Sequence, residues 1–167
     1  MKFKVVPEPR PLDFLDRARL TMPLVPGDED DCCARLVADT DLASRDAARE
    51  WITFMRALGL VAESDGGYYR PREAFDDAAL ARAFRERVHP VEAVLDVLTD
   101  AERPLDADAV FERIVDEVPR WERSRRTDWQ AVWSERVERI LAWCVAFGLA
   151  ERVDGGYRSV DGPPTER

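Results

Sequence analysis

Arginine residues gather in two short stretches of this chain, and a guanidinium group is well suited to binding phosphate. Arg45 and Arg49 follow Ser44 and stand four residues apart. A second, more basic stretch contains Trp121 and precedes Trp129, and its arginines are Arg120, Arg123, Arg125 and Arg126. Arginines mixed with aromatic rings are typical of surfaces that contact phosphates and bases. Both stretches are therefore candidate DNA-binding sites.

Each stretch also has an interpretation that needs no ligand. Asp46 and Glu50 lie beside the first pair of arginines, where they would form ion pairs and repel phosphate. Glu117 and Glu122 accompany the second stretch in the same way. The sequence leaves both interpretations open for both stretches.

Histidine and cysteine, two residue types that often carry out catalysis or bind metals, are sparse. His89 is the only histidine and stands before Pro90, and the chain has no glycine-rich phosphate loop and no nucleophile elbow. Cys32 and Cys33 are adjacent and Cys144 is distant, which is not the spacing of a zinc or iron–sulfur site. We therefore expect a non-enzymatic protein with no cofactor and no metal, with a redox pair at Cys32 and Cys33 as the alternative.

The elements that would position these residues occur twice. Residues 48–70 and 137–159 align without a gap at an offset of 89 residues, and both contain Gly-Leu followed by Asp-Gly-Gly-Tyr. Glycine commonly ends a helix, and Asp-Gly is favoured in a two-residue hairpin turn. Each copy therefore predicts a helix stopped by glycine, a short strand, a tight turn and a return strand that starts with tyrosine.

Apolar residues at helical spacing predict three helices before each hairpin and one helix between the copies. Leu105 stands alone before a helix of the second copy and suits a strand of one bridge. In chain order, the predicted helices are 12–20, 30–40, 44–58, 71–89, 90–100, 106–119 and 127–147. They divide the chain into a first module, a linker helix, a second module and a flexible tail, at residues 1–71, 72–89, 90–160 and 161–167.

This order of helices and hairpin resembles the winged helix-turn-helix superfamily over most of residues 11–160. The stretch Arg-Pro-Leu-Asp-Ala-Asp-Ala-Val at 103–110 is similar to the start of the second helix in that superfamily. The resemblance implies a fold that is mainly α with small β-hairpins (α+β), made of two winged-helix modules in tandem joined by a helix. It also implies a DNA-associated regulator of transcription, in which the helix from Ser44 enters the major groove and Arg45 and Arg49 reach phosphates or guanine edges.

Two departures from the superfamily favour a different function. The connection at 118–127 is longer than the compact turn usual in DNA readers. The hairpin tips carry Asp65 and Asp154 where DNA-binding wings present lysine or arginine, although Asp-Gly also suits the turn by itself. The alternative is a protein–protein interaction module, similar to tandem winged-helix subunits that bind a protein partner without DNA.

The last predicted helix of the second copy is apolar on nearly all sides. Trp133, Leu141, Trp143 and Val145 add to an apolar stripe that already faces the core of its module. An apolar surface of this size is typical of an interface, so we expect these residues to face the other module, a protein partner or a second copy in a homodimer. The alternative is a well-packed core helix in which all of these residues face the first copy.

The chain is strongly acidic, with a net charge of −9 and a pI of about 4.8, and Lys2 and Lys4 are its only lysines. This composition is typical of salt-loving microbes, where concentrated salt shortens the Debye length to about 3 Å at 1 M. Acidity therefore does not exclude DNA as a partner. The longest apolar segment, 140–150, is too short to span a bilayer, so we expect a cytoplasmic protein with no membrane partner.

Overall fold

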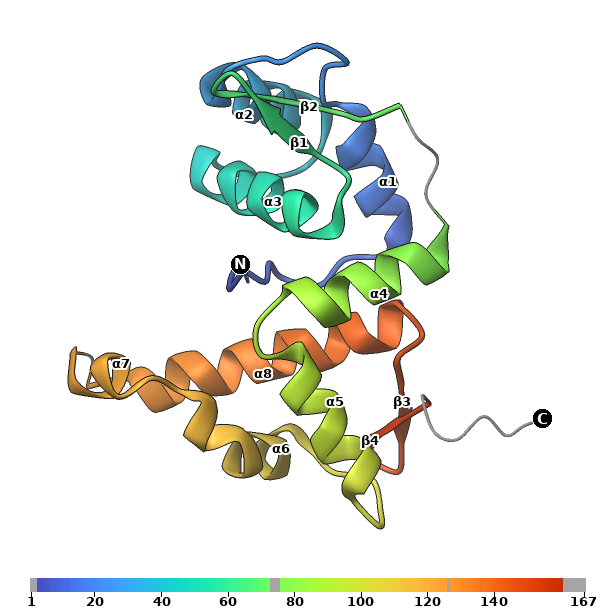
Figure 1. The fold of residues 1–167 in the computed structure, drawn as a ribbon, viewed down its shortest axis with the longest axis vertical. Coiled ribbons are helices and arrows are strands. Elements are labelled where there is room, and N and C mark those ends of the chain that lie inside the picture. The colour runs from blue at the N-terminus through green and yellow to red at the C-terminus, as the bar shows by residue number, and fades with distance from the viewer. Residues whose placement is uncertain (1–2, 73–75, 126, 161–167) are drawn as a thin grey trace. The chain divides into compact units, whose positions relative to one another are not determined.

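The computed structural model of this protein describes residues 3–72, 76–125 and 127–160. By its internal contacts the chain divides into two units, residues 1–88 and 89–167. In the described residues, three α-helices precede an antiparallel hairpin in unit 1, and four α-helices precede one in unit 2 (Figure 1). This confirms the predicted fold, which is mainly α with small β-hairpins and repeats one winged-helix arrangement. The predicted tail lies outside the described residues.

Capping side chains start the second and third helices of unit 1. The Asp28 carboxylate accepts a hydrogen bond from the Asp31 amide at 2.7 Å, and the Ser44 hydroxyl accepts one from the Ala47 amide at 3.1 Å. Gly59 then ends the third helix in the left-handed conformation, at φ 82°. The elements of unit 1 are α1 (Leu12–Leu20), α2 (Glu29–Asp39), α3 (Arg45–Leu58), β1 (Ala62–Ser64), β2 (Gly67–Tyr69) and α4 (Asp77–Arg87).

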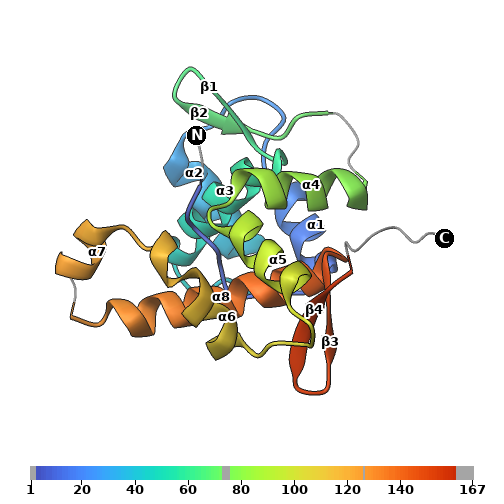
Figure 2. The same ribbon diagram turned by 60° about the horizontal axis from the view of Figure 1, so that its bottom comes forward.

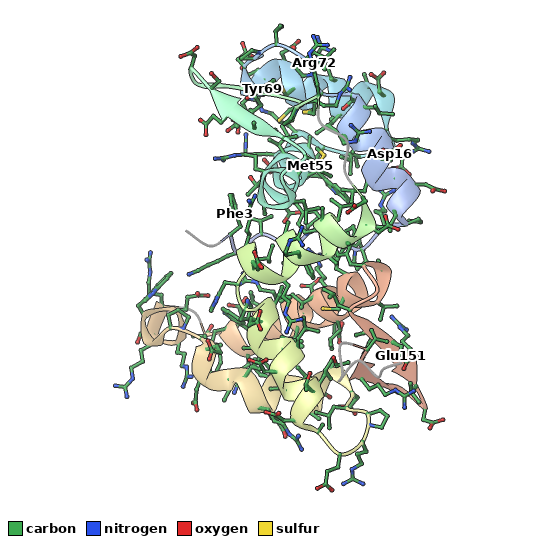
Figure 3. All side chains as sticks on the ribbon, turned by 45° about the vertical axis from the view of Figure 1, so that its right-hand side comes forward. Phe3, Asp16, Met55, Tyr69, Arg72 and Glu151 are labelled. Carbon is green, nitrogen blue, oxygen red and sulfur yellow. The ribbon has the colours of Figure 1, made fainter. Side chains whose placement is uncertain are left out.

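Aromatic rings hold α3 between α1 and α4 in the core of unit 1. The ring of Trp51 lies 4.9 Å from that of Phe14 on α1, and the ring of Phe54 lies 6.1 Å from that of Phe84 on α4. Met55, on the same face of α3, lies in the interior of the unit (Figure 3). This packing makes α4 part of unit 1.

The helix predicted to open at Pro71 starts later in the structure. Its described part begins at Asp77. Asp76 caps this helix, because its carboxylate accepts a hydrogen bond from the Ala79 amide at 2.7 Å. Residues 73–75 lie outside the described part of the chain. The placement of the module boundary at residue 72 therefore stays a prediction.

Unit 2 repeats the arrangement with one additional helix. The predicted helix at 106–119 ends earlier, at Ile114, and Pro119 begins the extra helix, because its carbonyl accepts hydrogen bonds from the amides of Glu122 and Arg123 at 3.1 and 3.3 Å. The extra helix occupies the connection expected to be a long turn. The elements of unit 2 are α5 (Val91–Asp100), α6 (Ala107–Ile114), the 3₁₀ turn η1 (Val115–Glu117), α7 (Arg120–Arg125), α8 (Trp129–Ala146), β3 (Ala150–Val153) and β4 (Gly156–Ser159).

The two hairpins have the same turn. Asp65 and Gly66 have φ values of 54° and 79°, and Asp154 and Gly155 have values of 50° and 81°. Positive φ at both central residues is the geometry of a type I′ turn, which matches the twist of the paired strands. The Asp-Gly pair therefore forms the central two residues of the turn in both units.

A third, one-bridge strand adds to each hairpin. Gly27 pairs with Tyr68 through amide-to-carbonyl hydrogen bonds of 2.8 and 2.9 Å, and Leu105 pairs with Tyr157 through bonds of 2.7 and 3.0 Å. The prediction of a one-bridge strand at Leu105 is confirmed. Figure 2 shows the hairpin of unit 2 at the C-terminal end of α8, with α7 at the opposite end of that helix.

Candidate nucleic-acid interface

The start of α3 in unit 1 carries the first pair of predicted DNA contacts. The Arg45 guanidinium forms an ion pair with Asp30 on α2. The Arg49 guanidinium lies 3.5 Å from a Glu29 carboxylate oxygen, also on α2, and 3.2 Å from Asp46. Both arginines are therefore held by carboxylates, two of which come from the neighbouring helix.

Acidic side chains surround this pair because α2 begins with four of them in succession. The run is Asp28, Glu29, Asp30 and Asp31, and Asp28 caps the helix. Carboxylates are favourable there because the first turn of a helix exposes amide N–H groups and the positive end of its dipole. The same carboxylates repel a phosphate that approaches Arg45 or Arg49.

The α7 helix of unit 2 presents a different arrangement. Trp121 is 55% exposed, and the guanidinium carbon of Arg125 lies 5.8 Å from the centre of its ring. Arg120 and Arg125 are also exposed, and neither forms an ion pair with another residue that the structure describes. We call these three side chains, Arg120, Trp121 and Arg125, the α7 surface.

The opposite side of α7 is attached to the rest of unit 2. Arg123 donates a hydrogen bond from Nη2 to the Val115 carbonyl at 2.6 Å, and its guanidinium lies 5.2 Å from the ring centre of Trp129. Glu122 accepts a hydrogen bond from the indole Nε1 of Trp133 at 2.9 Å. Arg123 and Glu122 thus attach α7 to unit 2, through the Val115 carbonyl and the indole of Trp133. Arg126, the fourth predicted arginine, lies outside the described residues.

The predicted interface residues on α8 differ in exposure. Trp133, Leu141 and Trp143 have no exposed surface, whereas Val145 is half-buried. Trp133 contacts its own unit, since it donates to Glu122 and has the Arg136 guanidinium 4.5 Å from its ring centre. An interface role for the four residues stays a prediction.

The hairpins offer few arginines to a ligand. Arg158 of β4 lies 2.7 Å from the carboxylate of Glu151 on β3, and Figure 3 labels Glu151 at this hairpin. Arg56 pairs with Glu63 at 3.0 Å in unit 1, and the Arg152 guanidinium lies 5.2 Å from the Tyr157 ring centre. The wings therefore combine acidic tips with arginines that already have partners.

The two adjacent cysteines lie on α2 and are buried. Burial, helped by the carboxylate of Asp31, raises the pKa of the Cys32 thiol from 9.0 to about 11, and burial next to Glu29 also raises the pKa of Cys33. Successive side chains of a helix point about 100° apart, which does not suit a disulfide between neighbours. The geometry favours two protonated core thiols over a redox pair.

We expect the cysteine thiols to react with a chromogenic disulfide reagent at pH 8 only after the protein unfolds, because Cys32, Cys33 and Cys144 are all buried. The time course of labelling, with and without denaturant, measures this. Because folding raises the pKa of Cys32, its contribution to stability is present below pH 9 and is lost as pH rises towards 11. Rapid labelling of the folded protein would contradict the buried arrangement.

Two features of the described residues bear on possible ligands. No group of three or more histidine, cysteine, aspartate or glutamate side chains there is placed to hold a metal ion. Over the same residues, no helix combines the length and the apolar character needed to cross a membrane.

Comparison with known protein families identifies the fold from the sequence. Residues 1–163 match the model of the halobacterial double winged helix domain. The chain belongs to this family. The match confirms the predicted tandem of winged helices, and the family name agrees with the acidic composition. No curated protein and no solved structure matches this double winged helix chain.

Proposed function

We propose that this double winged helix protein is a non-enzymatic, DNA-associated regulator of transcription that contacts DNA through the α7 surface and the first turn of α8. The observation that supports it is the contrast between the two arginine stretches. Arg120 and Arg125 are exposed with no carboxylate partner among the described residues, whereas Arg45 and Arg49 are neutralised by acids. The family itself supports the DNA-binding type of fold and no finer function.

Electrostatics explains why this contrast matters. Binding to DNA gains free energy when a cationic side chain replaces the counterions condensed on a phosphate. An arginine that already pairs with a carboxylate must first lose that pair, so the net gain is small. Arg120 and Arg125 have no such pair to lose within the described structure.

The position of α8 allows base contacts beside these phosphate contacts. Gln130 is exposed in the first turn of α8, immediately after the basic stretch, and an amide side chain can bind adenine in the major groove. Glu135 and Glu138 are exposed further along the helix and would repel the DNA backbone. Contact should therefore be confined to the start of α8.

A matched pair of double variants tests this proposal. In mobility-shift titrations of a duplex over a range of KCl concentrations, Arg120→Ala/Arg125→Ala should weaken binding and lower the slope of log affinity against log salt by about 2. Arg45→Ala/Arg49→Ala removes the same charge and should leave that slope nearly unchanged. Equal effects of the two variants, or no shift of any duplex by the wild type, would contradict the proposal.

A second candidate function is protein binding without DNA. It is supported by the carboxylates around Arg45 and Arg49 and by the aspartates at both hairpin tips. The partner would be another protein or a second copy of this chain. Crosslinking in cells followed by parallel recovery of DNA and protein separates the two functions, because only a regulator should enrich specific DNA.

A further inference from the structure

Trp121 differs from the other tryptophans of the chain. It is 55% exposed, whereas Trp51 is 2% exposed and Trp133 and Trp143 have no exposed surface. Trp129 is half-buried under the Arg123 guanidinium. A large ring is usually buried when it serves only to pack a core, so the exposure of Trp121 calls for a physical reason.

The attachment of α7 fixes which way this ring faces. Glu122 and Arg123 bind Trp133 and Val115 on the body of unit 2. Residues four apart lie on the same face of a helix, so Trp121 and Arg125 share a face that differs from the attached one. The ring is thus presented to solvent by a helix that is held on its other side.

We propose that Trp121 is a stacking platform for an unpaired base of single-stranded DNA, with Arg120 and Arg125 on the phosphates beside it. This inference rests on the proposed function and adds to it, since it gives the α7 surface a second form of DNA besides the duplex. An indole ring offers a flat face to any base, and such stacking is a large, sequence-tolerant part of single-strand binding. Bases within a duplex expose only their edges in the grooves. The indole ring can therefore stack only on a base that is not paired and stacked within a duplex.

Charge and salt favour a nucleic-acid strand over an apolar protein segment as the occupant. Arg125 lies by the ring and Arg120 is exposed on the same short helix, in a chain whose net charge is −9, so the α7 surface complements a polyanion. In concentrated salt the Debye length falls to about 3 Å at 1 M, which weakens phosphate contacts between exposed charges. Stacking does not depend on counterion release, so the ring would keep affinity where the arginines lose it.

Titration of the full chain with three oligonucleotides tests the inference. The probes are a single-stranded DNA of mixed pyrimidines, a blunt duplex of equal length, and the RNA version of the single strand. Single-stranded DNA should quench tryptophan fluorescence, because Trp121 is the most exposed of the chain's tryptophans. Trp121→Leu should weaken single-strand binding about 5- to 100-fold, and Trp121→Phe, which keeps an aromatic face, should retain most of it.

Stability and duplex binding are the controls for these variants. Trp121→Leu and Trp121→Phe should both unfold at the wild-type denaturant midpoint because Trp121 is exposed. Duplex binding should depend on Arg120 and Arg125 and not on Trp121. The inference is overturned, with the proposed function intact, if the wild type binds the duplex but not single strands, or if Leu and Phe act alike. Tighter binding of the RNA than of the DNA strand overturns the assignment to DNA, and binding of no probe overturns both.

Discussion

Replacing Trp133 with alanine is expected to lower the free energy of unfolding of the protein by about 3–5 kcal/mol. The side chain has no exposed surface, and its ring centre lies 4.5 Å from the Arg136 guanidinium and 6.5 Å from the His89 ring centre. Its indole N–H also donates to Glu122 on α7 at 2.9 Å. The substitution therefore removes buried apolar surface and a hydrogen bond at once.

Chemical denaturation followed by far-ultraviolet circular dichroism measures this effect. Trp121→Ala is the matched control, since it deletes the same side chain where it is 55% exposed and should change stability by no more than about 0.5 kcal/mol. Trp133→Phe keeps most of the packing but removes the donor to Glu122, so it should cost about 1–3 kcal/mol. Similar stability of the two alanine variants would contradict a core role for Trp133.

The same hydrogen bond links stability to the proposed DNA surface. Glu122 belongs to α7, and the indole of Trp133 is one of the groups that hold this helix to unit 2. Trp133→Phe should therefore loosen the α7 surface, and faster amide exchange at residues 120–125 would report it. An unchanged exchange rate there would show that Arg123 alone is enough to hold the helix.

The helix ends, caps and hairpin turns could be predicted from the sequence because each depends on residues close together in the chain. Glycine at the end of α3 and the Asp-Gly pair of each turn act through backbone φ values that few other residues adopt, so the two hairpins follow from neighbouring residues. The caps at Asp28 and Ser44 likewise bind amides three residues away. Such features depend on short stretches of chain, which is why a duplicated motif was sufficient to predict them.

Contacts between distant residues explain what the sequence did not predict. Asp46 and Glu50 were the expected partners of Arg49, but Glu29 on α2 also pairs with it, twenty residues away. The α7 helix was missed because its side chains bind partners on other elements, as Arg123 does with Val115. The ion pairs of α3 and the exposed α7 surface together moved the proposed DNA contacts from unit 1 to unit 2.

The second glycine of each Asp-Gly-Gly-Tyr motif has a role that only the third strand reveals. A Cβ atom at Gly156 would lie 3.0 Å from the carbonyl carbon of Leu105 and 3.1 Å from its amide nitrogen and its oxygen. A Cβ atom at Gly67 would lie 3.0 Å from the Gly27 oxygen and 3.0 Å from Pro26 Cβ. The one-bridge strand therefore crosses each hairpin so closely that a Cβ atom would have to push this strand away by a few tenths of an ångström.

We expect Gly67→Val and Gly156→Val each to lower the free energy of unfolding by about 3 kcal/mol, because the contacted atoms are mostly backbone and cannot move without breaking the bridge. Gly27→Ala is the control in unit 1, since its Cβ would meet its nearest neighbours at 3.4 Å, an ordinary contact. Denaturation midpoints give the stability, and amide exchange at Tyr68 and Tyr157 reports the bridges directly. Full protection of both tyrosine amides in the valine variants would contradict the close approach, and loss of only one would show that the duplicated units are not equivalent there.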